Sequence, residues 1–312
     1  MSTAESMRRH VQDLVGAVSD GHRELLCHQW ESEERRRWQY TPGPRPGLAL
    51  AAMDDAQRDA AMSLLRDGLS EDGFATARAV MELESVLHDL ERQQGRPGSE
   101  RRHPEHYWFA VFGDIATAGH PWAWRVGGHH VCVHATVVAD SVVMLPLFLG
   151  ANPAVAPGGD RVLPREEDLG RELVLSLSDA QQAQAVLAAE APDDILTGNA
   201  VRAELAAVPT GLPYADLAAT QQAVFERLLA VYVGRSAPPP TVPVRLAEAT
   251  FAWMGSTAEG EGHYYAIRAG SLFIELDNTQ DGANHVHTVV RDVERDWGED
   301  LLRSHYAARH PG

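Results

Sequence analysis

The sequence predicts an α+β protein whose antiparallel sheet is built from two strand-rich segments, residues 107–148 and 247–291, and is covered by helices. Three observations predict this class. Apolar side chains recur at helical spacing through the first 95 residues. Both strand-rich segments hold short runs of aromatic and β-branched residues separated by turn-sized breaks, which is typical of antiparallel meanders. The order of helices, strands, helices and strands favours an α+β arrangement.

The N-terminal 95 residues predict a helical layer over the sheet. Pro and Gly in residues 38–48 interrupt the helical pattern, and Asp or Ser stands where two later helices would begin. The expected helices run over 4–19, over 22–37, from Asp54 or Asp55 to Leu65, and from Ser70 or Asp72 to Gly95.

The first strand-rich segment predicts a meander with a hairpin turn at residues 139–141. Its expected strands are 107–114, 122–128, 129–138 and 141–150. A Pro- and Gly-rich loop over 151–164 follows. Apolar residues at helical spacing then predict helices over 165–176, 178–190 and 218–234.

The remaining sequence begins with SAPPPTVP, residues 236–243, which we expect to be a stiff polyproline-like connector. Strands are expected over 251–256, 263–270, 271–278 and 285–292, and a closing helix over 300–310. We therefore expect a single α+β domain over residues 1–312. Its parts are a helical layer (1–95), a first strand unit (107–148), helices (165–234), and a second strand unit with the C-terminal helix (247–312).

The two strand-rich segments share a spacing of residues, His-x4-Arg-x-Gly-x8-Thr. The matching residues are His120 and His263, Arg125 and Arg268, Gly127 and Gly270, and Thr136 and Thr279. This spacing suggests a duplicated hairpin. Two copies related by a pseudo-twofold axis would bring both polar strand faces to a shared cleft.

Charge and composition exclude several classes of partner. The net charge of −17 and the pI of about 5.3 argue against nucleic acid and against anionic membrane surfaces. The longest apolar run, residues 141–151, contains a proline and is too short to span a bilayer. We therefore expect a small-molecule substrate, and the oligomeric state stays open.

Cysteine use and the N-terminus indicate a reducing compartment. Cys27 and Cys132 are too few for a disulfide framework or a four-thiolate zinc site. Residues 1–15 have the pattern of an amphipathic helix and lack the apolar core of a signal peptide. These features predict a cytoplasmic protein.

The same two segments hold the candidate metal ligands. Because side chains alternate between the faces of a strand, His130, Cys132 and His134 share one face, as do Glu275 and Asp277 on another strand. His285 and His287 follow with the same spacing. Two histidines and a carboxylate bind divalent metal ions and leave positions open for water, substrate or dioxygen.

We therefore expect a metal-dependent enzyme that acts on a small molecule. The expected ligands are Glu275, His285 and His287, with His130 as a further ligand and His134 as an additional one. Iron or copper with dioxygen, and hence an oxidoreductase, is favoured, and zinc with an activated water is the alternative, with Glu275 as ligand or general base.

Polar neighbours would support this site. Asp277, Gln280 and Asn284 lie near enough in sequence to accept hydrogen bonds from the metal-binding imidazoles or to act on the substrate. Arg125 and Arg268 could hold an anionic group of the substrate. The expected catalytic set is Arg125, Asp277, Gln280 and Asn284.

Other interpretations of these residues stay open. The polar strand faces could be solvated, or could line the pocket of a non-catalytic binding protein. Cys132 could be a nucleophile activated by His130 or His134. The sequence lacks a GxGxxG turn between strand and helix and a Walker lysine, so nucleotide cofactors are not indicated.

Several stretches between Trp38 and Tyr306 resemble the bacterial family catalogued as domain of unknown function 3500. They are RRRWQYTPGPRPGL, FGDIATAGHPWAWRVGGHH, LPLFLGANPA, ELDNTQDGANHVHTVVRDVERDWGEDLL and SHY, of which Asn278-Thr279-Gln280 and Asn284-His285-x-His287 are the most specific. The family pattern tends to carry a small polar residue and then Asn where this sequence has Cys132 and His134. The resemblance thus gives Glu275, His285 and His287 more weight than His134, but implies little about mechanism.

Overall fold

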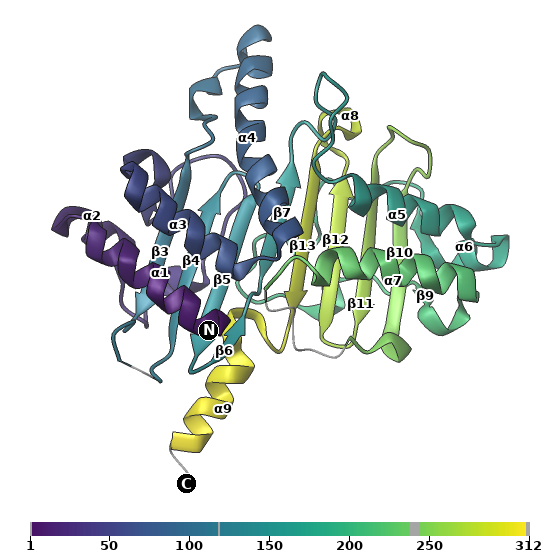
Figure 1. Cartoon of the computed structure of the whole chain (residues 1–312). Coiled ribbons are helices and arrows are strands. Elements are labelled where there is room, and N and C mark those ends of the chain that lie inside the picture. The colour runs from purple at the N-terminus through teal and green to yellow at the C-terminus, as the bar shows by residue number, and fades with distance from the viewer. Residues whose placement is uncertain (1, 118, 238–243, 310–312) are drawn as a thin grey trace. The chain divides into compact units, whose positions relative to one another are not determined.

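The computed structural model describes residues 2–117, 119–237 and 244–309 (Figure 1). The chain forms two compact units. Unit 1 consists of Met1–Leu147, Arg235–Thr241 and Glu294–Gly312, and unit 2 consists of Phe148–Gly234 and Val242–Val293. The sequence predicts a single domain, and this division into two compact units does not test that prediction.

Unit 1 is a small sheet with helices. Its strands are β1 (Cys27–His28), β2 (Leu48–Ala49), β3 (Tyr107–Gly113), β4 (Trp122–Gly128), β5 (Val131–Val138) and β6 (Ser141–Val143). They lie in the order β1-β3-β4-β5, with β2 paired to β3 and β6 paired to β5. The helices are α1 (Thr3–Ala17), α2 (Asp20–Leu26), α3 (Asp55–Gly68), α4 (Glu71–Gln93) and α9 (Glu299–Arg309).

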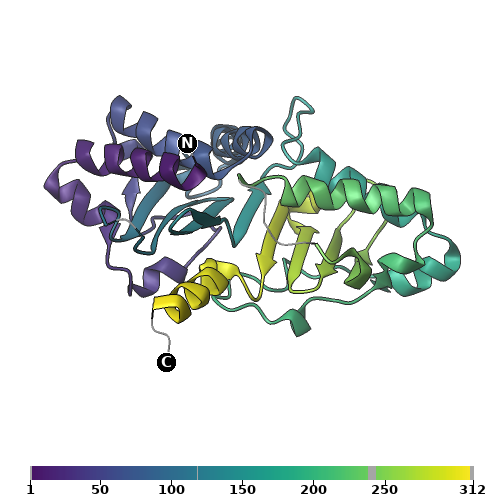
Figure 2. The same cartoon turned by 60° about the horizontal axis from the view of Figure 1, so that its bottom comes forward.

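The helices α1, α3 and α4 lie on one side of the unit 1 strands and α9 on the other (Figure 2). Each of the first three begins at a polar cap: Ser2, Asp54 and Ser70 accept hydrogen bonds from the first-turn backbone. Gly68 has no Cβ, and a Cβ there would lie 2.7 Å from the Trp124 ring. The small residue therefore lets α3 approach the aromatic core of β4.

Unit 2 is a larger sheet with helices. Its strands are β7 (Leu147–Ala151), of which residues 148–151 belong to this unit, β8 (Val186–Ala188), β9 (Leu212–Pro213), β10 (Ala249–Gly255), β11 (His263–Ala269), β12 (Leu272–Asn278) and β13 (Val286–Asp292). Their order is β7-β13-β12-β11-β10-β8, with β9 paired to β10. The helices are α5 (Pro164–Ser176), α6 (Asp179–Ala185), α7 (Ala219–Val233) and α8 (Gln280–Ala283).

Different segments cover the two faces of the unit 2 sheet. On one face Tyr265 donates a hydrogen bond to the carbonyl of Glu166 in α5, and its hydroxyl lies 2.5 Å from that of Tyr232 in α7. On the other face Tyr264 and Phe273 pack with Val208, which lies in the irregular segment 189–211. This second face carries the polar residues described below.

Short 3-10 helices join the larger elements. They are η1 (Glu33–Arg36), η2 (Leu50–Ala52), η3 (Ser99–Arg101), η4 (Leu205–Ala207), η5 (Tyr214–Asp216), η6 (Leu246–Glu248) and η7 (Asp296–Gly298). Residues 238–243, most of the expected polyproline connector, lie outside the described residues. None of the helices in the described ranges is both long and apolar enough to cross a bilayer.

Most predicted elements are confirmed, with three corrections. The helix expected over 22–37 ends at Leu26, because Cys27 and His28 pair with β3 in parallel. The strand expected over 141–150 is divided into β6 and β7 around Pro146, which has no N–H for a ladder. The helix expected over 178–190 ends at Ala185, after which β8 pairs with β10.

The fold class is confirmed as a mixture of helices and mostly antiparallel strands, but β1–β3 and β8–β10 are parallel pairs. The predicted duplication is not shown. Arg125 lies opposite His134 in β4–β5, whereas Arg268 lies opposite Phe273 in β11–β12. A duplicated hairpin would place Arg268 opposite Asp277, so the two hairpins pair in different registers.

Candidate functional site

A row of polar side chains crosses the second face of the unit 2 sheet. Asp277 of β12 lies opposite Tyr264 of β11 on one side and opposite His287 of β13 on the other. Directly opposed residues share a face of the sheet, so these three side chains are neighbours. The predicted alternation is therefore confirmed for Asp277 of β12, which faces His287 of β13, whereas His285, expected in the same strand as His287, precedes β13.

The connection from β12 to β13 holds His285 beside this row. Asp281, Gly282 and Ala283 have φ values of 50°, 71° and 59°, which turn the chain tightly through the left-handed region. The Asn278 side-chain oxygen accepts a hydrogen bond from the backbone N–H of His285 at 3.0 Å. The Asn278 amide thereby fixes the distance between the end of one strand and the start of the next.

The two histidines of this connection lie together. The ring centroids of His285 and His287 are 4.6 Å apart, with the rings nearly perpendicular. His287 Nδ1 lies 2.7 Å from a carboxylate oxygen of Asp194. When Nδ1 of His287 donates a hydrogen bond to Asp194, Nε2 is the ring nitrogen that can bind a metal ion.

His285 has neighbours of its own. Its Nδ1 lies 3.2 Å from the side-chain nitrogen of Asn152 and 3.4 Å from a carboxylate oxygen of Asp281. Asn152 follows β7 and Asp281 lies in α8, so residues from two distant parts of the sequence hold this ring.

Asp277 is the most unusual group of the row. Its side chain is 0 % exposed. One oxygen accepts hydrogen bonds from the backbone and hydroxyl of Thr279, whereas the other, Oδ2, is buried without a hydrogen-bond partner in the described part of the chain. Burial, opposed by the bonds from Thr279 and reinforced by the charge of Asp194, raises the pKa of Asp277 to about 7.

Glu275, the predicted carboxylate ligand, accepts hydrogen bonds from protein groups with both of its oxygens. It lies opposite Val289 and not opposite a histidine. Its oxygens accept hydrogen bonds from the backbone N–H groups of Leu196 and Thr197, from the Thr197 hydroxyl, and from the Tyr264 hydroxyl at 2.8 Å. Burial raises its pKa and these bonds oppose the rise. Glu275 therefore fastens the segment 189–211 to the sheet.

Gln280 and Asn284, predicted as catalytic, also bind backbone. Gln280 donates to the carbonyl of Asp193 at 3.1 Å. Asn284 accepts from the N–H of Val155 at 2.7 Å, and its own carbonyl accepts from Ala154. Both side chains thus hold loops around Asp194 and Asn152.

Arg125 of β4 lies opposite His134 of β5, so their side chains share a face with that of Cys132, whereas His130, expected on the same face, precedes β5 with a φ of 60°. Arg125 is buried and donates to the carbonyls of Glu34, Arg37 and Pro46 at 2.7, 2.6 and 3.0 Å. Arg268 of unit 2 similarly donates to the carbonyl of Val208 and to a threonine hydroxyl. Both guanidiniums, predicted to hold substrate, bind neighbouring segments of their own unit.

Cys132 and His134 also contact unit 1 backbone. The Cys132 thiol donates to the carbonyl of Gln39, and burial raises the pKa of Cys132 to about 11. A thiol with this pKa is protonated at neutral pH, which removes support for the nucleophile interpretation. His134 Nδ1 lies 3.2 Å from the carbonyl of Pro146, and its ring meets the Trp297 ring edge-on.

His130 stacks on His129 with ring centroids 3.7 Å apart. His129 makes a short contact from Nδ1 to Glu84, and Arg102 lies 3.2 Å from the same nitrogen while pairing with Glu91 at 2.7 Å. Burial raises the pKa of Glu84 to about 8, and the charge of Arg102 opposes the rise. In each unit the Nδ1 of a histidine thus lies against a carboxylate, His129 against Glu84 and His287 against Asp194. The rings of His129, His130 and His285 carry nitrogens that can bind a metal ion.

Sequence reasoning missed Asp194, Asn152 and Glu84. The sequence does indicate that Glu84 is buried, because it stands on the apolar face of its helix, three residues after Met81 and three before Leu87. Asp194 and Asn152 stand in irregular segments with no periodicity, and no spacing connects them to His287 or His285.

Comparison with known proteins gives one match. Residues 1–299 match the family described as "Protein of unknown function (DUF3500)". No curated protein and no solved structure matches the chain. Since the match covers nearly the whole sequence, the chain belongs to this family of unknown function.

Proposed function

We propose that the protein is a metal-dependent enzyme, in which His285, His287 and Asp277 of unit 2 bind a divalent ion that activates a small-molecule substrate. The buried Asp277 Oδ2 carries the proposal. A carboxylate oxygen that is removed from water without a hydrogen-bond partner is costly, and a bound cation would compensate it.

The two histidines suit this ion as well. Asp194 holds His287 by Nδ1, which is the usual arrangement of a metal-binding imidazole and the carboxylate behind it. His285 lies beside it, held by Asn152. Binding by all three side chains at lengths of about 2 Å requires rotations of the side chains from their present positions.

This ligand set differs from the predicted one in its carboxylate. Asp277 takes the place proposed for Glu275, because the oxygens of Glu275 already accept four hydrogen bonds. The predicted roles of His130 and His134 as ligands stay predictions.

Two histidines and one carboxylate leave coordination positions open for substrate and dioxygen. Iron or copper with dioxygen would make the protein an oxidoreductase. Zinc on the same ligands would supply an activated water for hydrolysis. In both cases Asp194 would keep His287 in the metal-binding tautomer.

Metal analysis of protein purified without an affinity tag tests the proposal. We expect about one iron, copper or zinc per chain, and an increase in melting temperature on adding the metal, because an ion bound by the folded state stabilises it. Less than about 0.2 metal per chain without such an increase would reject the metalloenzyme. The element found separates redox from hydrolytic chemistry.

Variants then locate the site. His287→Ala and Asp277→Asn should each lose the metal, because each removes a ligand. Asp216→Asn removes a carboxylate that is exposed elsewhere in unit 2 and should retain it. Full metal content in both ligand variants would contradict the assignment.

A further inference from the structure

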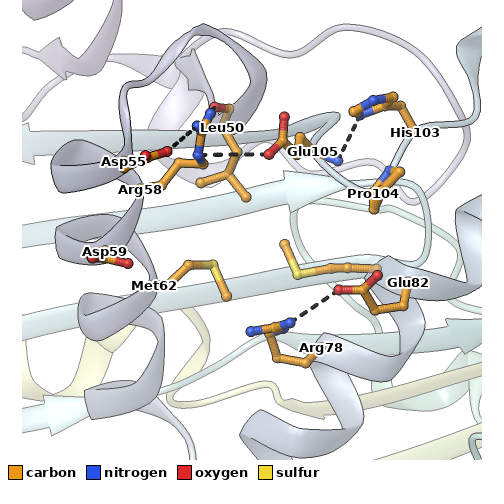
Figure 3. A pocket seen from close by; sticks show the side chains of 11 residues that line it. Leu50, Asp55, Arg58, Asp59, Met62, Arg78, Glu82, His103, Pro104 and Glu105 are labelled. Carbon is orange, nitrogen blue, oxygen red and sulfur yellow. Dashed lines mark hydrogen bonds and ion pairs between the residues drawn. The ribbon is translucent and has the colours of Figure 1, made fainter.

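Helices α3 and α4 of unit 1 border a cavity of about 640 Å³ (Figure 3). Residues 103–105 close a third side. This volume lies within the range of about 300–1,000 Å³ that small-molecule sites occupy. None of the residues discussed for the metal site lines this cavity.

The base of the cavity is apolar and flexible. Met62 of α3, Met81 of α4 and Leu50 contribute to the lining, and the last two are buried. Figure 3 shows Met62 projecting from its helix toward the side of the cavity that carries Arg78 and Glu82. Methionine is unbranched and polarizable, so such a surface adapts to an alkyl chain.

Acidic groups predominate around this apolar base. The lining contains the carboxylates of Asp55, Asp59, Glu82 and Glu105 and only two guanidiniums, those of Arg58 and Arg78. Both guanidiniums are already paired within the lining. Arg58 lies 2.7 Å from Asp55 and 3.7 Å from Glu105, and Arg78 lies 3.1 Å from Glu82.

Asp59 is the lining carboxylate that is left over. Within the described ranges it has no hydrogen bond and no ion pair, and it stands on α3 one turn before Met62. A ligand that enters the cavity therefore meets an available negative charge next to an apolar surface. This combination selects an organic cation with an apolar body and rejects anions.

The absence of a ring cage narrows the class of cation. No Phe, Tyr or Trp lines the described cavity, so a quaternary ammonium ion would find no aromatic faces. A primary amine can instead donate hydrogen bonds to carboxylates. Since acidic groups lie on both helices and on the loop, a chain with one amine on Asp59 can reach a second carboxylate, which shares its charge with Arg58 or Arg78, while its methylenes cover Met62.

We propose that this cavity binds a linear aliphatic diamine or polyamine. The amines pair with Asp59 and with a carboxylate across the cavity, and the methylene chain lies on the methionine surface.

Isothermal titration of the full chain with putrescine and spermidine at about 0.15 M salt tests the proposal. We expect saturable binding at one site, weaker binding of butylamine, which has one amine, and no competition by magnesium at equal concentration. Magnesium that displaces the amines as well as they displace each other would show diffuse attraction to an acidic protein and would overturn the proposal.

Two cavity variants and a matched control locate the binding. Asp59→Asn should weaken spermidine binding about fivefold, the upper end of the effect of one exposed ion pair. Met62→Lys places an ammonium group in the cavity and should weaken it more. Asp89→Asn removes an exposed carboxylate from α4 outside the cavity and should leave the affinity unchanged. Equal affinities in all three variants would overturn the proposal, and circular dichroism confirms that each is folded.

Discussion

In unit 1 the polar strand face that carries Arg125, Cys132 and His134 contacts backbone carbonyls of nearby segments through the Arg125 guanidinium, the Cys132 thiol and His134 Nδ1. In unit 2 the face that carries Glu275 and Asp277 is matched only in part. Glu275 accepts four hydrogen bonds, whereas one oxygen of Asp277 is left without a partner in the described chain.

The difference teaches how to interpret polar residues on buried strands. Both faces show the same alternation of apolar and polar side chains in the sequence. In unit 1 irregular segments cover this strand face in place of a helix. Their backbone carbonyls lack the partners that a helix would supply, so the polar side chains of the strands contact them. In unit 2 Glu275 likewise binds the backbone of an irregular segment, whereas Asp277 Oδ2 has no hydrogen-bond partner among the described residues. A polar pattern on a buried strand is therefore not by itself the sign of a binding site.

The largest effect should come from Arg125→Leu. This change leaves the carbonyls of Glu34, Arg37 and Pro46 without their donor in a buried place, and we expect the free energy of unfolding to fall by about 3 kcal/mol. Urea denaturation measures it. Arg92→Leu, at an exposed position of α4, is the control and should change little. A loss below about 1 kcal/mol would mean that the unit 1 face does not depend on this residue.

Glu275→Gln should produce the next largest effect. The amide nitrogen would face the N–H or O–H donors that now point at a carboxylate oxygen, and we expect a loss of about 2 kcal/mol in unfolding free energy. Asp277→Asn, two residues on, is the matched control. Its Oδ2 has no donor to lose among the described residues, so metal-free protein should change by less than about 1 kcal/mol. Equal losses in both variants would remove the distinction between the two carboxylates.

These two carboxylates also show what the sequence could predict. The alternation of side chains correctly placed Glu275 and Asp277 on one face of β12, because strand geometry has a period of two. It could not show which carboxylate would be satisfied. That depends on Leu196 and Thr197, which stand in a segment without periodicity and reach Glu275 only through the tertiary fold.

The fold was predictable for a similar reason. Long elements such as α4 and β12 carry a clear period and a cap or a turn at each end. Short elements were missed where tertiary pairing decides the backbone, as at Cys27 and His28, whose side chains and spacing still suit a helix. The suggested duplication is not shown, because four shared residues cannot fix strand register, which the hairpin turn sets, and the two hairpins pair in different registers.

The stability of the protein should depend on pH through Glu84, the buried acid of unit 1. The pKa of Glu84 is raised to about 8, chiefly by burial, so the protonated form is favoured in the folded state. Its stabilisation is complete below the ordinary pKa of 4.5 and disappears as the pH rises through about 8. Relative to Glu84→Gln, the protein should therefore lose unfolding free energy between pH 5 and pH 9. Urea denaturation across this range measures the difference, and parallel curves for the two proteins would contradict it.

The smallest effects should come from two hairpin turns. Ala139 of unit 1, in the turn between β5 and β6, has a φ of 53°, whereas Gly270 of unit 2, between β11 and β12, has a φ of 68°. A side chain in this left-handed region costs about 1–2 kcal/mol, and glycine loses about 0.5–1 kcal/mol through its freedom in the unfolded chain.

Ala139→Gly should therefore raise the unfolding free energy by about 0.5 kcal/mol, and Gly270→Ala should lower it by about 1 kcal/mol. The second change is larger because a Cβ at Gly270 would also meet Arg245 at 3.3 Å, while Ala139 is exposed. Thermal or urea unfolding of both variants measures the pair. If both substitutions destabilise equally, the turn of unit 1 needs its methyl group, and backbone strain is not what separates the two hairpins.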